Sequence, residues 1–173
     1  MSGSGNREHE RKFLVQDLSI LDGLVGNELE QGYLFSVAGW KARARRERIA
    51  NGDGKFVESQ AMFTLKGPKR GTTSPEYEFA LELPHAMELV ELAPFKIQKT
   101  RYPVLSEGNA WEVDVFHGAN QGLVVAEFEA STTLVEALRP PWWSGPEVTA
   151  DHRYSNEYLA EHPWASWATG TGT

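Results

Sequence analysis

The stretch that decides the fold is Glu8-His9-Glu10-Arg11-Lys12-Phe13-Leu14-Val15, where charged side chains recur two residues apart before the chain becomes apolar. Three later stretches show the same spacing with charges of one sign: Lys41-Ala42-Arg43-Ala44-Arg45, Glu76-Tyr77-Glu78 and Glu127-Phe128-Glu129. A period of two is that of a β-strand, so each stretch directs its charges to one face of a sheet. A face that gathers carboxylates on some strands and Arg or Lys on others can hold a divalent metal ion together with a polyanion.

Alternation and turn residues predict a mainly antiparallel protein. Asn51-Gly52-Asp53-Gly54 is a turn signal, and Gly67-Pro68 ends a strand. Most connections are too short for the crossover helices that parallel strands need. The predicted strands are 8–15, 31–37, 40–49, 61–66, 74–83, 95–104, 109–116 and 122–129, and the predicted helices are 84–93, 131–138 and 155–161.

The composition limits the class of protein. The 173 residues, 40% of them hydrophobic and 24% charged, fit one globular domain with a full core. The lack of cysteine excludes thiolate catalysis, disulfides and cysteine zinc sites. A net charge of −7 argues against general affinity for nucleic acid. No apolar run approaches the length of a membrane span, and the first residues lack the apolar segment of a signal peptide, so we expect a cytoplasmic protein.

Nearly every predicted strand has one apolar face and one charged face, and this pattern allows two interpretations. The first is an antiparallel sheet with one side in the core and one side in water. The second is a barrel with charge inside and apolar residues outside, wrapped by helices. Blocks of one sign favour the second, because neighbouring like charges repel and a plain surface offers no compensation. Such an interior must be hydrated and hold counter-ions, because an unpaired buried charge is strongly destabilising.

Seven motifs follow one another in a fixed order. They are the opening Glu8 to Val15, Arg43-Ala44-Arg45, Thr64-Leu65-Lys66-Gly67, Glu76-Tyr77-Glu78, Lys99-Thr100-Arg101-Tyr102, Trp111-Glu112-Val113-Asp114-Val115-Phe116 and Glu127-Phe128-Glu129. This series, with a terminal helix near 154–160, resembles the CYTH superfamily, the triphosphate tunnel metalloenzymes. It is most similar to bacterial members that cleave inorganic tripolyphosphate.

The resemblance implies an α+β fold: an eight-stranded antiparallel closed β-barrel, or tunnel, with a charged interior and a few flanking helices. It implies a single domain over residues 7–162. We expect the Gly/Ser-rich residues 1–6 to be a flexible tail and the Trp-rich residues 163–173 to be a loose tail.

The resemblance also assigns roles by motif position. The expected catalytic residues are Glu8, Glu10, Lys12, Glu127 and Glu129, and the four glutamates among them are the main metal ligands. The carboxylates expected to line the tunnel and to serve a second metal or position water are Glu76, Glu78, Glu112 and Asp114. The expected phosphate-binding residues are Lys12, Arg43, Arg45, Lys66, Lys99 and Arg101.

The implied activity is hydrolysis of inorganic tripolyphosphate to pyrophosphate and phosphate with Mg²⁺ or Mn²⁺, without a covalent nucleophile. Thiamine triphosphatase, nucleoside triphosphatase and class IV-type adenylate cyclase activities stay open, as does a non-catalytic module that binds polyphosphate or nucleotide. The two Glu-x-Glu pairs favour an enzyme. The expected partner is a small polyanion rather than nucleic acid or a membrane, and a homodimer is left open. The segment 46–60 is longer and more polar than expected, which indicates either an extended hairpin or an altered tunnel mouth.

Overall fold

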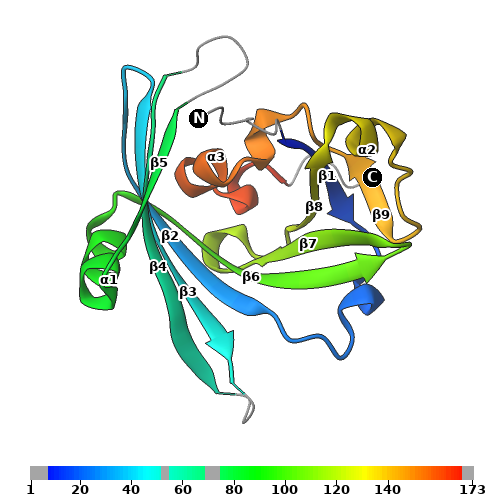
Figure 1. Cartoon of the computed structure of the whole chain (residues 1–173), viewed down its shortest axis with the longest axis horizontal. Coiled ribbons are helices and arrows are strands. Elements are labelled where there is room, and N and C mark those ends of the chain that lie inside the picture. The colour runs from blue at the N-terminus through cyan, green and yellow to red at the C-terminus, as the bar shows by residue number, and fades with distance from the viewer. Residues whose placement is uncertain (1–7, 52–54, 69–74, 169–173) are drawn as a thin grey trace, which may run out of the picture.

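One curved sheet of nine antiparallel strands forms the body of the protein (Figure 1). The computed structural model describes residues 8–51, 55–68 and 75–168. The strands lie in the order β5-β4-β3-β2-β6-β7-β8-β1-β9. Their bounds are β1 (Glu8–Val15), β2 (Asn27–Val37), β3 (Trp40–Ala50), β4 (Phe56–Lys66), β5 (Glu76–Ala80), β6 (Phe95–Ser106), β7 (Asn109–Phe116), β8 (Val124–Ser131) and β9 (Ser144–Glu147).

The described residues form three α-helices, which cover the sheet from both sides (Figure 1). Figure 1 shows α3 (Asn156–Glu161) on the concave side and α1 (Leu83–Leu92) and α2 (Thr132–Ala137) outside the curve. Single 3-10 turns cover Leu18–Leu21, Gly118–Asn120, His152–Tyr154 and Trp164–Ser166. Pro84 lies in the first turn of α1, as its fixed φ angle favours. No helix of the described residues is long and apolar enough to cross a membrane.

The expectation of a closed eight-stranded barrel is wrong. Within the residues that the structure describes, the sheet is open, with β5 and β9 as its two edges, and it has nine strands. The strand that the sequence did not predict is β9, which pairs with β1. It contains Gly145-Pro146, a dipeptide typical of turns, and proline is tolerated in a sheet mainly at its edge.

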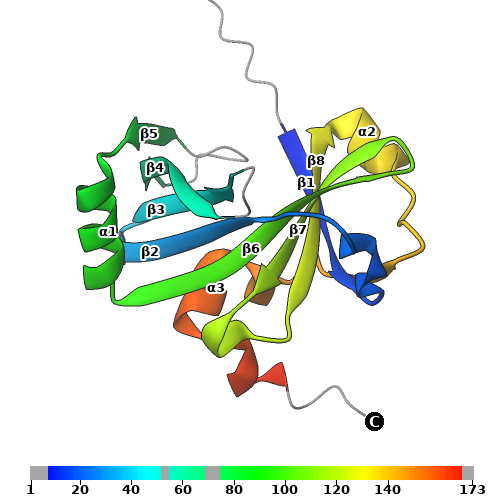
Figure 2. The ribbon, with the colours of Figure 1, turned by 90° about the horizontal axis from the view of Figure 1, so that it is seen from below.

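The polar segment 46–60 belongs to an extended hairpin. Strand β3 continues to Ala50 and β4 begins at Phe56, and these two residues pair across the hairpin. Residues 52–54 of the predicted turn lie outside the described residues, as does the N-terminal tail 1–6. In Figure 2, the paired strands β3 and β4 lie toward one end of the sheet, and β1 and β8 lie toward the other.

Two hydrophobic clusters lie on opposite faces of the same sheet. The outer cluster contains Phe13, Trp111, Phe128 and Trp143, and the Trp111 and Trp143 rings meet edge to face with centroids 5.2 Å apart. Val135 of α2 packs into it. We call these residues and their buried neighbours the outer core.

The inner cluster joins the concave face to α3. Ile97, Phe116 and Val125 of the sheet pack with Leu159 of α3, which is fully buried. Trp164 and Trp167 also pack against this cluster, so the region expected to be a loose tail from residue 163 contains packed residues at its start. On β6, β7 and β8, the side chains two residues away from a member of the inner cluster share the concave face with it.

Candidate active site

The strand register places the predicted site residues on the concave face. Glu127 lies opposite Lys12 on one side and Glu112 on the other, and Arg101 lies opposite Asp114. The same alternation continues across β2, β3, β4 and β5. The residues that share this face are Glu10, Lys12, Arg43, Arg45, Lys66, Glu76, Glu78, Lys99, Arg101, Glu112, Asp114, Glu127 and Glu129, and we call them the charged face. Glu8 pairs with Ser131 in the register, and its side chain lies outside the described residues.

Carboxylates gather where β7, β8 and β1 run together. Glu10 lies directly opposite Glu129, a like-charged cross-strand pair that repels unless a cation lies between its members. Lys12 Nζ lies 2.7 Å from Glu127 Oε1 and 3.4 Å from Glu10 Oε2. Glu112, Glu127 and Glu129 border a cavity of about 320 Å³. This end of the charged face therefore combines oxygen ligands with space for a bound ion.

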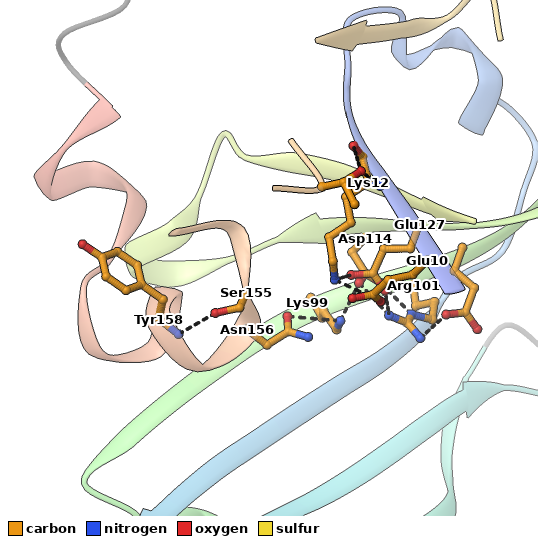
Figure 3. A network of polar contacts seen from close by, with 11 residues as sticks. Glu10, Lys12, Lys99, Arg101, Asp114, Glu127, Ser155, Asn156 and Tyr158 are labelled. Carbon is orange, nitrogen blue, oxygen red and sulfur yellow. Dashed lines mark hydrogen bonds and ion pairs between the residues drawn. The ribbon is translucent and has the colours of Figure 1, made fainter. Parts of the chain in front are cut away.

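A buried ion cluster lies beside these carboxylates, as Figure 3 shows. Asp114 is fully buried and pairs with Lys99, which is only 1% exposed. Arg101 holds Asp114 with two hydrogen bonds, Nε to Oδ1 and Nη2 to Oδ2, both 2.7 Å long. Arg101 also pairs with Glu112 and lies 3.3 Å from Glu127 Oε2. The guanidinium group is thus fixed in orientation by three carboxylates on two strands.

Burial and charge oppose one another in this cluster. Burial alone would raise the pKa of Asp114, but Lys99 and Arg101 outweigh it, so the pKa of this carboxyl lies below its usual value. Burial lowers the pKa of Lys99, against the attraction of Asp114. Burial also acts to lower the pKa of Arg101, but Asp114, Glu112 and Glu127 raise it overall.

Basic residues occupy the part of the charged face formed by β3 and β4. Arg43 Nη2 donates to Thr64 Oγ1 at 3.1 Å, and Thr64 Oγ1 donates to Glu78 Oε1 at 3.3 Å. Lys66 Nζ lies 3.4 Å from Glu76 Oε2. Arg45 lies on the same face next to Arg43, and burial lowers its pKa, with further lowering by Arg43 and Arg101. Burial raises the pKa of neighbouring Tyr33 to about 12, so this hydroxyl is neutral near pH 7.

The four carboxylates expected to line the tunnel lie on two strands. Glu112 and Asp114 lie on β7, whereas Glu76 and Glu78 lie on edge strand β5, with β4, β3, β2 and β6 between them. Asp114 serves as the counter-ion of Lys99 and Arg101. Among the described residues, no group of three or more carboxylates or histidines has the arrangement of a metal site.

Helix α3 supplies polar residues that sequence reasoning missed. Glu157 pairs with Lys41, and Asn156 Oδ1 lies 3.4 Å from Lys99 Nζ. Ser155 caps this helix by accepting a hydrogen bond from the Tyr158 backbone nitrogen at 3.2 Å (Figure 3). The sequence predicted a helix over 155–161, but it carried no signal for the face of the sheet that the helix covers. Sequence reasoning also missed Gln31. This residue begins the predicted strand 31–37, which is mostly apolar and carries no charge, so nothing in the pattern marked it as part of the site.

Comparison with known proteins gives consistent relatives, although no protein-family profile matches the chain. The chain is 35% identical over 163 residues to an inorganic triphosphatase of Acetivibrio thermocellus, covering 93% of this chain and 97% of the relative. It is 34% identical to an inorganic triphosphatase of Nitrosomonas europaea, covering 88% of this chain and 96% of the relative. The crystal structure of the inorganic triphosphatase NE1496 superposes with a TM-score of 0.68 at 33% identity, covering 88% of this chain and 93% of that one.

Proposed function

The chain belongs to the inorganic triphosphatases of the CYTH superfamily, and from this membership we propose that it hydrolyses inorganic tripolyphosphate to pyrophosphate and phosphate with the help of a divalent metal ion. The observation that carries the proposal is the charged face itself. Carboxylates of β1, β7 and β8 share this face with the cations of β3, β4 and β6. A triphosphate needs both: cations for its oxygens and carboxylates for the metal that accompanies it.

The cations bind and orient the substrate. Arg43 and Arg45 of β3 and Lys66 of β4 offer donors to the non-bridging oxygens, and arginine pairs with phosphate in a bidentate manner. Arg101 presents a guanidinium group whose orientation Asp114 fixes. A substrate held in this way loses little further freedom in reaching the transition state, so positioning accounts for part of the rate.

The carboxylates near β1 fit a divalent metal ion in their chemistry. Glu10 and Glu129 lie opposite one another with like charges, and oxygen ligands suit Mg²⁺ and Mn²⁺. Glu8 and Glu127 are the further ligands that we propose. When bound, the metal offsets negative charge on phosphate oxygens. Lys12 contacts both Glu10 and Glu127, so it tethers the two strands that carry these ligands.

We propose that residues 7–162 form one domain, that the substrate is a small polyanion, and that the enzyme is a cytoplasmic protein. Glu76 contacts Lys66. Glu78 accepts a hydrogen bond from Thr64, which in turn accepts one from Arg43. We therefore propose that these two carboxylates hold basic residues in place rather than bind the metal.

A substrate comparison tests the reaction. The protein is incubated separately with tripolyphosphate, thiamine triphosphate and ATP in Mg²⁺ or Mn²⁺, and free phosphate and cyclic AMP are measured. We expect phosphate release that is fastest from tripolyphosphate and absent in EDTA. Cyclic AMP from ATP would instead indicate a cyclase, and binding of tripolyphosphate without any product would indicate a non-catalytic module.

Two variants test the metal ligands. Glu10→Gln and Glu129→Gln keep the side-chain shape but remove one negative charge, so we expect metal-dependent phosphate release to fall by about two orders of magnitude or more. The melting temperature should stay close to that of the parent, because Glu10 is an exposed residue. Glu136→Gln, on the outer helix α2, is the matched control. Full activity in either variant would refute the assignment of these ligands.

A further inference from the structure

Gln31 is an unusual residue on the concave face. Its side chain is completely buried, and neither its amide nitrogen nor its amide oxygen has a hydrogen-bond partner among the described residues. A buried amide without partners destabilises a protein, so such groups are rare unless a ligand or water completes them. Since the residue has no contact with bulk solvent, whatever completes this amide must enter the fold.

The neighbours of Gln31 indicate what that partner is. The register places Gln31 opposite Arg45 on β3, and the next pair on the same face is Tyr33 opposite Arg43. The Nε atoms of Arg43 and Arg45 are also buried without a hydrogen-bond partner. Four buried polar atoms on two adjacent strands are therefore unsatisfied together, and three of them are donors.

The electrostatic balance at this place favours an anion. Arg43 and Arg101 lie close enough to Arg45 to disfavour its charge, which lowers the pKa of Arg45 beyond the effect of burial. Tyr33 does not compensate them, because burial raises its pKa to about 12 and keeps it neutral. Glu47, two residues along β3, opposes the lowering of the Arg45 pKa only in part, and it also accepts a hydrogen bond from Asn27 at 2.8 Å. Two guanidinium groups thus share a largely desolvated position with an unpaired amide.

We propose that Gln31, Arg43 and Arg45 form one phosphoryl-binding subsite, in which the Gln31 amide NH₂ donates directly to an oxygen of the bound polyphosphate. The subsite is distinct from the carboxylate end of the charged face and needs no metal ion. Gln31 adds a donor without adding charge, so it sets where a phosphoryl group lies between two flexible cations. The inference rests on the proposed function, which already assigns Arg43 and Arg45 to phosphate oxygens and supplies tripolyphosphate as the ligand. What it adds is the Gln31 donor.

The inference predicts two effects of opposite sign from one substitution. Gln31→Met removes the amide and keeps a side chain of similar length. Without ligand, its melting temperature should rise by about 2–10 °C, the scale for removing a buried unsatisfied amide from a protein of this size. Its affinity for tripolyphosphate should fall by about 10-fold or more, because a hydrogen bond to a charged oxygen is lost. If Gln31 only supported the fold, its replacement would not raise the melting temperature and weaken tripolyphosphate binding at the same time.

The experiment measures both quantities on the full chain. Calorimetric titration with tripolyphosphate in EDTA at low salt gives the affinity without hydrolysis, and thermal unfolding without ligand gives the stability. Gln98→Met is the matched control, because Gln98 lies next to Gln31's partner Ile97 on the opposite face and donates to Glu30 Oε1 at 3.0 Å. The control should lose a little stability and keep the affinity of the parent.

A second variant keeps the inference open to refutation if the methionine variant does not fold. Gln31→Glu keeps the side-chain shape, should pair with the arginines in the free protein, and should weaken tripolyphosphate binding by more than 10-fold. Parent-like affinity in whichever variant folds would overturn the inference, as would a parent that does not bind tripolyphosphate in EDTA. Binding that depends on Gln31 without phosphate release in Mg²⁺ or Mn²⁺ would refute the proposed function and leave the subsite standing.

Discussion

The substitution Asp114→Asn tests whether the buried ion cluster stabilises the fold as its geometry indicates. Asp114 is completely inaccessible to solvent and neutralises Lys99, which is only 1% exposed. The amide leaves the shape unchanged but leaves a lysine without a counter-ion in the interior. Breaking a buried pair by removing one partner costs about 3–5 kcal/mol. For a chain of this size the melting temperature should therefore fall by about 6–20 °C.

The assay is urea unfolding at two pH values, and the sign of the pH effect is fixed by Lys99. In the variant, burial lowers the pKa of Lys99 with no Asp114 to oppose it, so the folded pKa lies below the unperturbed 10.5. The unfolded state then binds the extra proton, and the free energy of unfolding rises with pH up to about that value. We expect the variant to recover much of its loss between pH 7 and pH 10. The parent should gain less over this range, because Asp114 partly opposes the lowering of the Lys99 pKa there.

Two further variants separate the cluster from unrelated effects. Adding Lys99→Met to Asp114→Asn removes the stranded charge and should restore part of the stability. Asp151→Asn breaks the exposed pair with Arg153 and should cost less than about 1 kcal/mol. An Asp114→Asn variant as stable as the parent, or a double variant no more stable than the single one, would refute the account of the cluster.

Two other predictions follow from the same groups. The pKa of Asp114 lies below its ordinary value of 3.8, so the stability that this carboxylate contributes should be lost as the pH falls from about 4 through the folded pKa. The stability of Asp114→Asn should therefore depend less steeply on pH in this acid range, and circular dichroism can follow the unfolding. Arg43→Met should raise the KM for tripolyphosphate by about 10- to 100-fold, measured from initial rates of phosphate release, because a charged hydrogen bond to substrate is lost. An unchanged KM would exclude Arg43 from the substrate site.

The two-residue spacing was sufficient to predict which side chains share a face. Lys12, Arg45 and Glu127 lie on strands far apart in the sequence, and the register places all of them on the concave side. The alternation of side chains between the two faces is a local property of each strand, so it does not depend on how the strands are arranged. Closure is not local: it depends on whether the two edge strands meet, and neither β5 nor the unpredicted β9 carries a sequence signal for that pairing.

The site residues that the sequence missed share one physical property. No described residue forms a hydrogen bond with the Gln31 amide, and Asn156 and Glu157 reach the charged face because α3 covers it. Both facts depend on which elements pack together, not on residue type or spacing. Asp114 is a related case: the sequence placed it among the carboxylates that line the tunnel, but its burial between Lys99 and Arg101 makes it a counter-ion. Partner choice in three dimensions decides the role of such a residue.

The outer core has a consequence for how this fold can change over time. Its aromatic side chains lie on the reverse side of the strands that carry the charged face, so the two sets are joined mainly through the backbone that they share. Substitutions in the two layers should then combine almost additively. Residues of the charged face can then be exchanged during evolution while the outer core keeps the strands packed. The same fold can thus acquire new substrates without first becoming more stable.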